Sequence, residues 1–137
     1  MQRVFYIFML ILLVDACTLQ KTAVKVGINE GEAETDSIEY ELITFDSKFE
    51  SWYTLHSNSA AFRSQAYYEN WNRQYVTAWN FNATQPQKSN FFEPIVGYEA
   101  DVDYGIDINH KLFYYFQYVE NVLKMEIMPN SPRAVLF

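Results

Sequence analysis

Apolar and polar residues follow two different spacings along the chain, and each spacing predicts a type of secondary structure. Residues 38–43 alternate apolar and acidic side chains, which predicts a half-buried strand with Ile38, Tyr40 and Leu42 facing inward. Ser47 and Glu50 then match the spacing of a capping box, and the apolar residues that follow predict a short helix over roughly 47–57.

Two longer helices are predicted from apolar residues three and four positions apart. Ser64 can cap the first, over roughly 64–81, and Asn109 can open the second, over roughly 108–123. Side chains at this spacing share one helix face, so we expect both helices to be amphipathic. The residues expected on these faces are Tyr68, Trp71, Tyr75 and Trp79 in the first helix, and Leu112, Phe116, Val119 and Leu123 in the second.

Two further apolar segments predict strands, one over 91–100 with Pro94 at a sheet edge and one over 125–128. The resulting order is β-α-α-β-α-β, a single small α+β domain with about three short, antiparallel strands and three helices. We assign residues 37–129 to this domain and residues 130–137 to a C-terminal tail, because prolines and Asn130 interrupt the pattern there.

The first residues have the pattern of an export signal. Arg3 precedes the continuous apolar segment Val4–Val14, and Asp15 ends that segment before the small residue Ala16. The alternative is a membrane anchor, but a spanning helix needs about 20 apolar residues. We therefore assign residues 1–16 to a signal peptide.

Cys17 is the single cysteine of the chain and directly follows this segment. Residues 13–17 resemble the bacterial lipobox, in which the cysteine is acylated and becomes the mature N-terminus. Val14 and Ala16 fit that pattern, whereas Asp15 departs from it, and ordinary cleavage leaving a free thiol is the alternative. Lipidation of Cys17 would anchor the protein to a membrane, with the remainder of 17–36 as a flexible tether.

The net charge of the chain bears on whether it binds nucleic acid. The 137 residues carry a formal net charge of −7, and sequence-independent nucleic-acid binding needs clustered cations, so we expect no nucleic-acid partner. Aromatic residues make up 18% of the chain. A small domain without disulfides can obtain buried apolar area from such large side chains.

The acidic turn before the last predicted helix is the main candidate for cation binding. Asp101, Asp103 and Asp107 could supply oxygen ligands, but Leu112 stands where a calcium-binding loop needs a bidentate Glu. A closed Cys/His zinc site is excluded because there is only one cysteine. We therefore expect no metal and no cofactor. A metal-dependent hydrolase that uses this turn with His110 is a minor alternative.

Aromatic rings beside polar side chains form a candidate binding surface, because flat rings stack on sugars and amides bond hydroxyl groups. The alternative is that these rings belong to the core, as a stripe at helical spacing ordinarily does. The candidate residues are Trp71, Trp79, Asn80, Tyr98, Asp103 and Tyr104.

Several segments together resemble a family of small uncharacterised lipoproteins from Bacteroidota. The resemblance runs from about Ser37 to Ile127 and is densest around Trp79-Asn80 and Asp103-Tyr104-Gly105. It implies a lipoprotein of the cell envelope, in the outer membrane, and it implies no known activity.

Surface-exported lipoproteins of that phylum usually carry acids directly after the cysteine. Here the first acid is Glu30, so the resemblance implies a domain that faces the periplasm. These observations favour a non-enzymatic domain that meets another envelope protein, either as an interaction or as an accessory domain. The alternative is a glycan- or peptidoglycan-binding lipoprotein that uses exposed aromatic rings.

Overall fold

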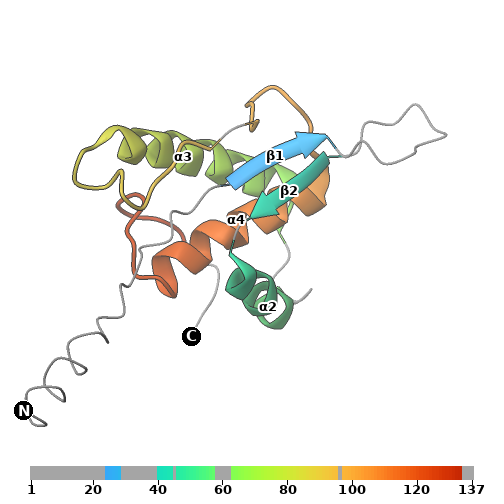
Figure 1. Cartoon of the computed structure of the whole chain (residues 1–137). Coiled ribbons are helices and arrows are strands. Elements are labelled where there is room, and N and C mark those ends of the chain that lie inside the picture. Colours follow the sequence, from blue (N-terminus) through green and yellow to red (C-terminus); the bar gives the residue numbers. More distant parts are fainter. Residues whose placement is uncertain (1–23, 29–39, 45, 58–62, 96, 134–137) are drawn as a thin grey trace, which may run out of the picture.

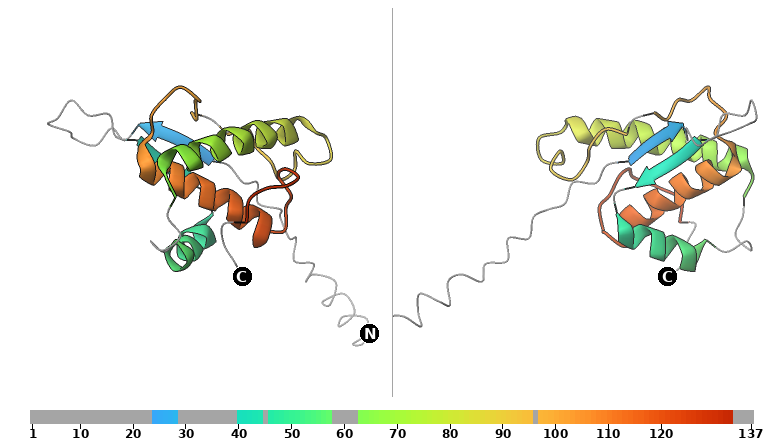
Figure 2. Two further views of the ribbon diagram at one scale, coloured as in Figure 1. Left: turned by 180° about the vertical axis from the view of Figure 1, so that it is seen from behind. Right: turned by 45° about the vertical axis from the view of Figure 1, so that its right-hand side comes forward.

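A single helix, α4, is the element that the other elements pack against. The computed structural model describes residues 24–28, 40–44, 46–57, 63–95 and 97–133. In these residues the fold is α+β, with three helices and a two-stranded antiparallel sheet, which confirms the predicted class. Figures 1 and 2 show α4 between α3 and α2, with the strand pair lying across it. The elements are β1 (Val24–Ile28), β2 (Tyr40–Thr44), α2 (Ser47–His56), α3 (Gln65–Thr84) and α4 (Gly105–Asn121).

Helix α4 is buried on all sides over its central turns. Every residue from Leu112 to Val119 is buried, and so are Asn109 and His110 within the turn before them. The helix predicted over 108–123 is present, but it begins at Gly105, so Asn109 does not open it. The expected amphipathic pattern is also wrong. Helices α2 and α3 and strand β2 contact α4, so its surface is covered from several directions rather than along one stripe.

The two strands form an antiparallel pair in which Val26 lies opposite Leu42. Val24, Val26 and Leu42 are buried, so one face of the pair contributes to the core. Strand β2 confirms the strand predicted at 38–43, although Ile38 lies outside the described residues. The assignment of 17–36 to a tether is wrong for residues 24–28, because pairing with β2 turns this short segment into a strand.

Helices α2 and α3 begin at polar caps. The side chain of Ser64 accepts from the backbone N–H of Tyr67, as predicted for the start of α3. At α2 the cap is Asp46 rather than Ser47, and its carboxylate accepts from Lys48 N at 2.9 Å. Glu50 forms no capping box, because its carboxylate accepts from Thr44 and lies 3.0 Å from the Lys111 ammonium.

The strands predicted at 91–100 and 125–128 are absent from the described residues, and side chains supply hydrogen bonds to those backbones instead. Asn80 Oδ1 accepts from Ile95 N at 2.8 Å, and Asn82 Nδ2 donates to Ile127 O at 2.9 Å. Glu120 accepts from the backbone N–H groups of Ile127 and Met128. Because buried backbone groups need partners, these bonds allow irregular segments to cover the helices.

None of the described helices is long and apolar enough to cross a membrane.

Gly97 allows the segment after Ile95 to pass close to strand β1. Its φ is +85°, in the left-handed region, and a Cβ placed there would clash with the carbonyl oxygen of Val26. Gly105 also has a positive φ, +76°, but a Cβ there would meet nothing within 4 Å. A side chain at Gly97 would therefore cause both backbone strain and a steric clash, whereas one at Gly105 would cause backbone strain alone.

We expect Gly97→Ala to reduce the free energy of unfolding by more than about 2 kcal/mol, because strain and clash act together. Gly105→Ala should reduce it by only about 1–2 kcal/mol, since it introduces strain alone. Urea unfolding of both variants measures this difference. Equal losses for the two variants would contradict the close approach of Gly97 to β1.

Candidate functional site

The sequence-predicted binding residues lie in two separate places, and several of them are buried. Trp79 is fully buried and its Nε1 donates to Glu93 O at 2.6 Å. Asn80 accepts from Ile95 N, as described above, and Trp71 is half-buried against the core. These three side chains of α3 thus serve the packing of that helix, and the ring of Trp79 is not open to a sugar.

Tyr98 and Tyr104 lie together beside the start of α4. Their rings stack at a centroid distance of 5.0 Å and an angle of 21°. Tyr104 is 7% exposed, and its hydroxyl donates to Gly97 O and accepts from Glu99 N, each at 2.8 Å. The Tyr104 hydroxyl therefore holds the backbone of residues 97–99 against the start of α4. Tyr98 is half-buried.

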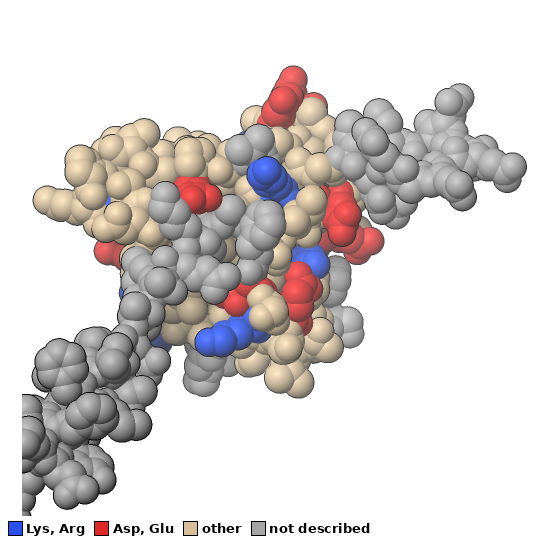
Figure 3. Space-filling view, viewed as in Figure 1, with Lys and Arg blue, Asp and Glu red and all other residues tan. Residues whose placement is uncertain are grey.

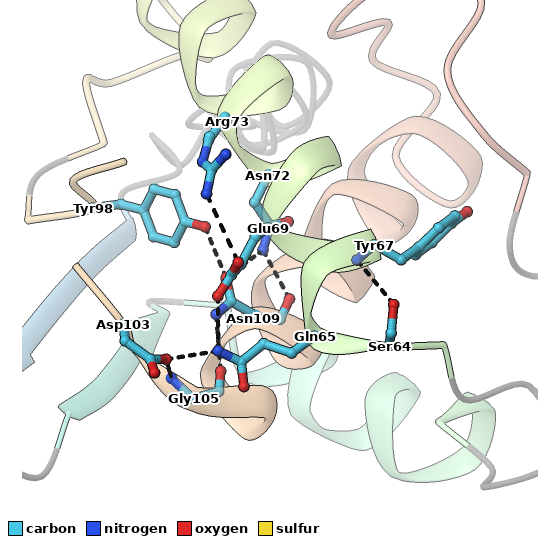
Figure 4. Close-up of polar contacts among 10 residues, drawn as sticks. All are labelled: Ser64, Gln65, Tyr67, Glu69, Asn72, Arg73, Tyr98, Asp103, Gly105 and Asn109. Carbon is cyan, nitrogen blue, oxygen red and sulfur yellow. Dashed lines mark hydrogen bonds and ion pairs between the residues drawn. The ribbon is translucent and has the colours of Figure 1, made fainter. Parts of the chain in front are cut away.

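A cluster of buried amides lies beneath Tyr98, with Asn109 at its centre (Figure 4). Asn109 Oδ1 accepts from the Tyr98 hydroxyl at 2.7 Å and from Asn72 Nδ2 at 3.2 Å. Asn109 Nδ2 donates to Gly105 O at 2.8 Å, and Asn72 Nδ2 also lies 2.9 Å from Asn109 O. These bonds join α3, α4 and the preceding loop. Burial raises the pKa of Tyr98 to about 12, so its hydroxyl keeps its proton and donates at neutral pH.

Charged and polar side chains surround this cluster at the surface (Figure 4). Gln65 Nε2 donates to Glu69 Oε1 at 2.8 Å and to Asp103 Oδ1 at 2.6 Å. Asp103 also accepts from Gly105 N, which holds the first turn of α4. The Arg73–Glu69 ion pair, at 3.7 Å, is exposed and adds little stability.

Asn72 is the residue of this cluster that was not selected from the sequence. It takes the position on the buried face of α3 that was assigned to Trp71, so the buried stripe reads Tyr68, Asn72, Tyr75 and Trp79. Asn72 is fully buried, and its Oδ1 has no hydrogen-bond partner among the described residues. The sequence does carry a signal for this position, because Asn72 lies four residues after Tyr68 and three before Tyr75, on the same helix face.

The comparisons with known proteins identify a family. The chain matches the model of a family of unknown function, DUF6146, over residues 4–132. The chain belongs to this family. Searches of curated proteins and of solved structures gave no match. The DUF6146 match agrees with an uncharacterised domain and assigns no role to Tyr98, Asn72 or Asn109.

The groups of this DUF6146 protein that could perform acid–base chemistry are dispersed or buried. Asp101, Asp103 and Asp107 are exposed, and the described residues contain no group of three side chains placed to hold a metal ion. His110 is 1% exposed, and burial lowers its pKa although Asp107 opposes this shift. Cys17 lies outside the described residues.

In the described part of this DUF6146 protein, hollows lie on the surface of α3 and at the end of α4. One hollow of about 610 Å³ lies along the outer face of α3, beside Phe81, which is 64% exposed. A second, of about 510 Å³, lies at the end of α4 between Glu120 and Arg133. Figure 3 shows acidic and basic side chains interspersed over the described part of one face, rather than gathered by sign.

We expect Asn109→Ala to reduce the free energy of unfolding by about 2–4 kcal/mol, because Asn72, Tyr98 and Gly105 each lose a buried partner. Asn70→Ala, on the exposed face of α3, should change it by less than about 0.5 kcal/mol. Thermal or urea unfolding tests both. Equal stabilities of the two variants would show that the cluster contributes nothing to the fold.

Proposed function

We propose that this protein is a lipid-anchored protein of the bacterial cell envelope, acylated at Cys17, whose α+β domain faces the periplasm as an interaction or accessory domain. The order of residues at the N-terminus carries the proposal: Arg3, the apolar segment Val4–Val14, and the lipobox-like residues 13–17. The resemblance to Bacteroidota lipoproteins supports an outer-membrane location.

The start of strand β1 adds a constraint on the anchored domain. Seven residue steps separate Cys17 from Val24, and an extended chain spans at most about 3.3–3.6 Å per residue. An acyl group on Cys17 therefore keeps Val24 within about 25 Å of the lipid surface. In this proposal the domain contacts partners that lie close to the membrane.

The arrangement of the described side chains favours an interaction role over catalysis. His110 is buried, the acidic side chains of residues 101–107 are spread over the surface, and the aromatic pair Tyr98–Tyr104 holds a loop. Exposed large apolar side chains lie on β2, α2, α3 and the end of α4: Ile43, Leu55, Phe81 and Val122. These are the side chains through which a protein partner would gain apolar contact.

We expect the chain, expressed in a bacterium that processes lipoproteins, to have the mass of residues 17–137 plus acyl chains. Each buried methylene contributes about 0.8 kcal/mol, so several chains give stable anchoring. Intact-mass spectrometry and membrane fractionation of wild type and Cys17→Ala test this, because the variant cannot be acylated and should stay unprocessed.

Thr18→Ala serves as the matched control and should be acylated like the wild type. A wild-type protein with a free thiol at Cys17 would overturn the lipid anchor. Pull-down in mild detergent with the acylated protein and with a charge-introducing Phe81→Asp variant then tests the interaction role. Retention of the same proteins by both would exclude the outer face of α3 as the contact.

A further inference from the structure

Helix α2 is attached to α4 through one fully buried side chain and a few half-buried ones. Phe49 is the one buried residue among its ten, and Leu55 on the opposite side is 79% exposed. The ring of Phe49 packs edge-on against Tyr115 of α4 at 5.0 Å and near Tyr118 at 5.6 Å. Trp52 and Tyr53, both half-buried, add ring contacts at 5.4 Å to Tyr118 and 5.8 Å to Tyr114. Polar contacts complete the attachment of α2 to α4.

Each of three polar contacts between this helix and α4 includes a titratable group. The Tyr53 hydroxyl lies 2.8 Å from His110 Nδ1, and the Glu50 carboxylate lies 3.0 Å from the Lys111 ammonium. At the N-cap, the Tyr118 hydroxyl donates to Asp46 Oδ2 at 3.0 Å. Among these types of group, histidine is the one that ordinarily changes charge between pH 5 and 8.

His110 is enclosed by aromatic rings from all three helices. Its ring centroid lies 5.7 Å from that of Tyr53 on α2, 5.1 Å from Tyr68 on α3 and 4.4 Å from Tyr114 on α4. Asp107, on the same helix, favours a charged ring, but desolvation is the larger effect and the pKa of His110 is lowered. Burial also raises the pKa of Tyr53 to about 12.

The other charged groups near this ring do not reverse the balance. Lys111 is adjacent in sequence and is paired with Glu50 of α2. Arg63, which precedes α3, donates its backbone N–H to the Tyr68 hydroxyl. Asp107 is thus the charged group that acts on the pKa of His110.

We propose that helix α2 is a pH-responsive element that is docked while His110 is neutral and is released from α4 when His110 binds a proton. Protonation makes both ring nitrogens of His110 donors, so Nδ1 can donate to the Tyr53 hydroxyl but can no longer accept from it. The added charge then lies among three phenol rings, and moving α2 away gives it access to water.

The direction of the effect follows from the difference between the two states. The exposed ring of the released state binds a proton near its ordinary pKa of about 6.5, whereas the docked ring binds it at lower pH. The free energy of docking is therefore at its full value above about pH 6.5 and decreases as the pH falls below that value. Returning to neutral pH removes the proton and docks the helix again.

Hydrogen exchange of the purified full chain, corrected for intrinsic exchange rates, measures the docking of α2 directly. We expect the protection of its amides to fall at least tenfold from pH 7.5 to pH 5.0, while that of α3 stays unchanged. In His110→Gln the side chain cannot charge, so protection at pH 5.0 should equal that at pH 7.5. His56→Gln, which removes the other histidine from α2 itself, is the matched control and should respond like the wild type.

A second variant keeps the test decisive if His110→Gln does not fold. Asp107 lies three positions before His110 on α4, so it favours the charged ring after α2 has left as well as before. Asp107→Asn makes the released ring bind its proton at lower pH, so the midpoint of α2 release should move to lower pH. A purely structural role for His110 predicts no such movement. Equal protection of wild-type α2 at both pH values, or an unmoved midpoint in Asp107→Asn, would overturn the proposal.

Discussion

Burial of α4 on all sides is the constraint on which the rest of the structure depends. An apolar cylinder could rotate or slide among its neighbours, but three polar side chains of α4 are also buried and each is bonded to a different place. Asn109 is bonded to Tyr98 and Asn72, His110 lies against Tyr53, and Gln117 Nε2 donates to Tyr75 at 2.9 Å. Because an unpaired buried polar group is costly, these partners fix the rotation and register of the helix.

The cost of unpaired buried polar groups also explains how a domain with only two described strands can cover its central helix. A small domain can cover a helix with strands, whose backbones pair with each other, or with irregular chain whose backbone is paired by side chains. In this fold, irregular chain paired by side chains covers the helices after Thr84 and after Asn121. Asn80, Asn82 and Glu120 hold those segments, and the indole of Trp79 adds one more bond.

The parts that sequence reasoning predicted are those with a strong local signal. The stripe through Tyr68, Tyr75 and Trp79 located α3, and the cap at Ser64 placed its start. Strand β1 could not be predicted because its partner, β2, is separated from it along the chain and Val24–Ile28 is short. The predicted strands at 91–100 and 125–128 failed because long-range side-chain bonds compete with strand pairing.

In the candidate site, too, residues close in sequence could be selected from the sequence, whereas contacts between distant residues could not. Tyr98, Asp103 and Tyr104 were selected because polar and aromatic residues are close in sequence there, and the structure does bring them near one another. Asn72 and Asn109 are 37 positions apart, so their contact depends on the packing of α3 against α4. The burial of Trp79 likewise follows from packing with segments 91–95 and α4, not from its helix alone.

The position of α4 in the chain has a consequence for how the protein is made. Synthesis proceeds from the N-terminus, so the strand pair, α2 and α3 emerge before the helix that they surround. Until residues 105–121 are available, Phe49, Tyr68 and Tyr75 have no buried partner on α4. The nascent chain therefore stays without its native core until late in translation, and truncation before Asn121 removes the centre of the domain rather than its edge.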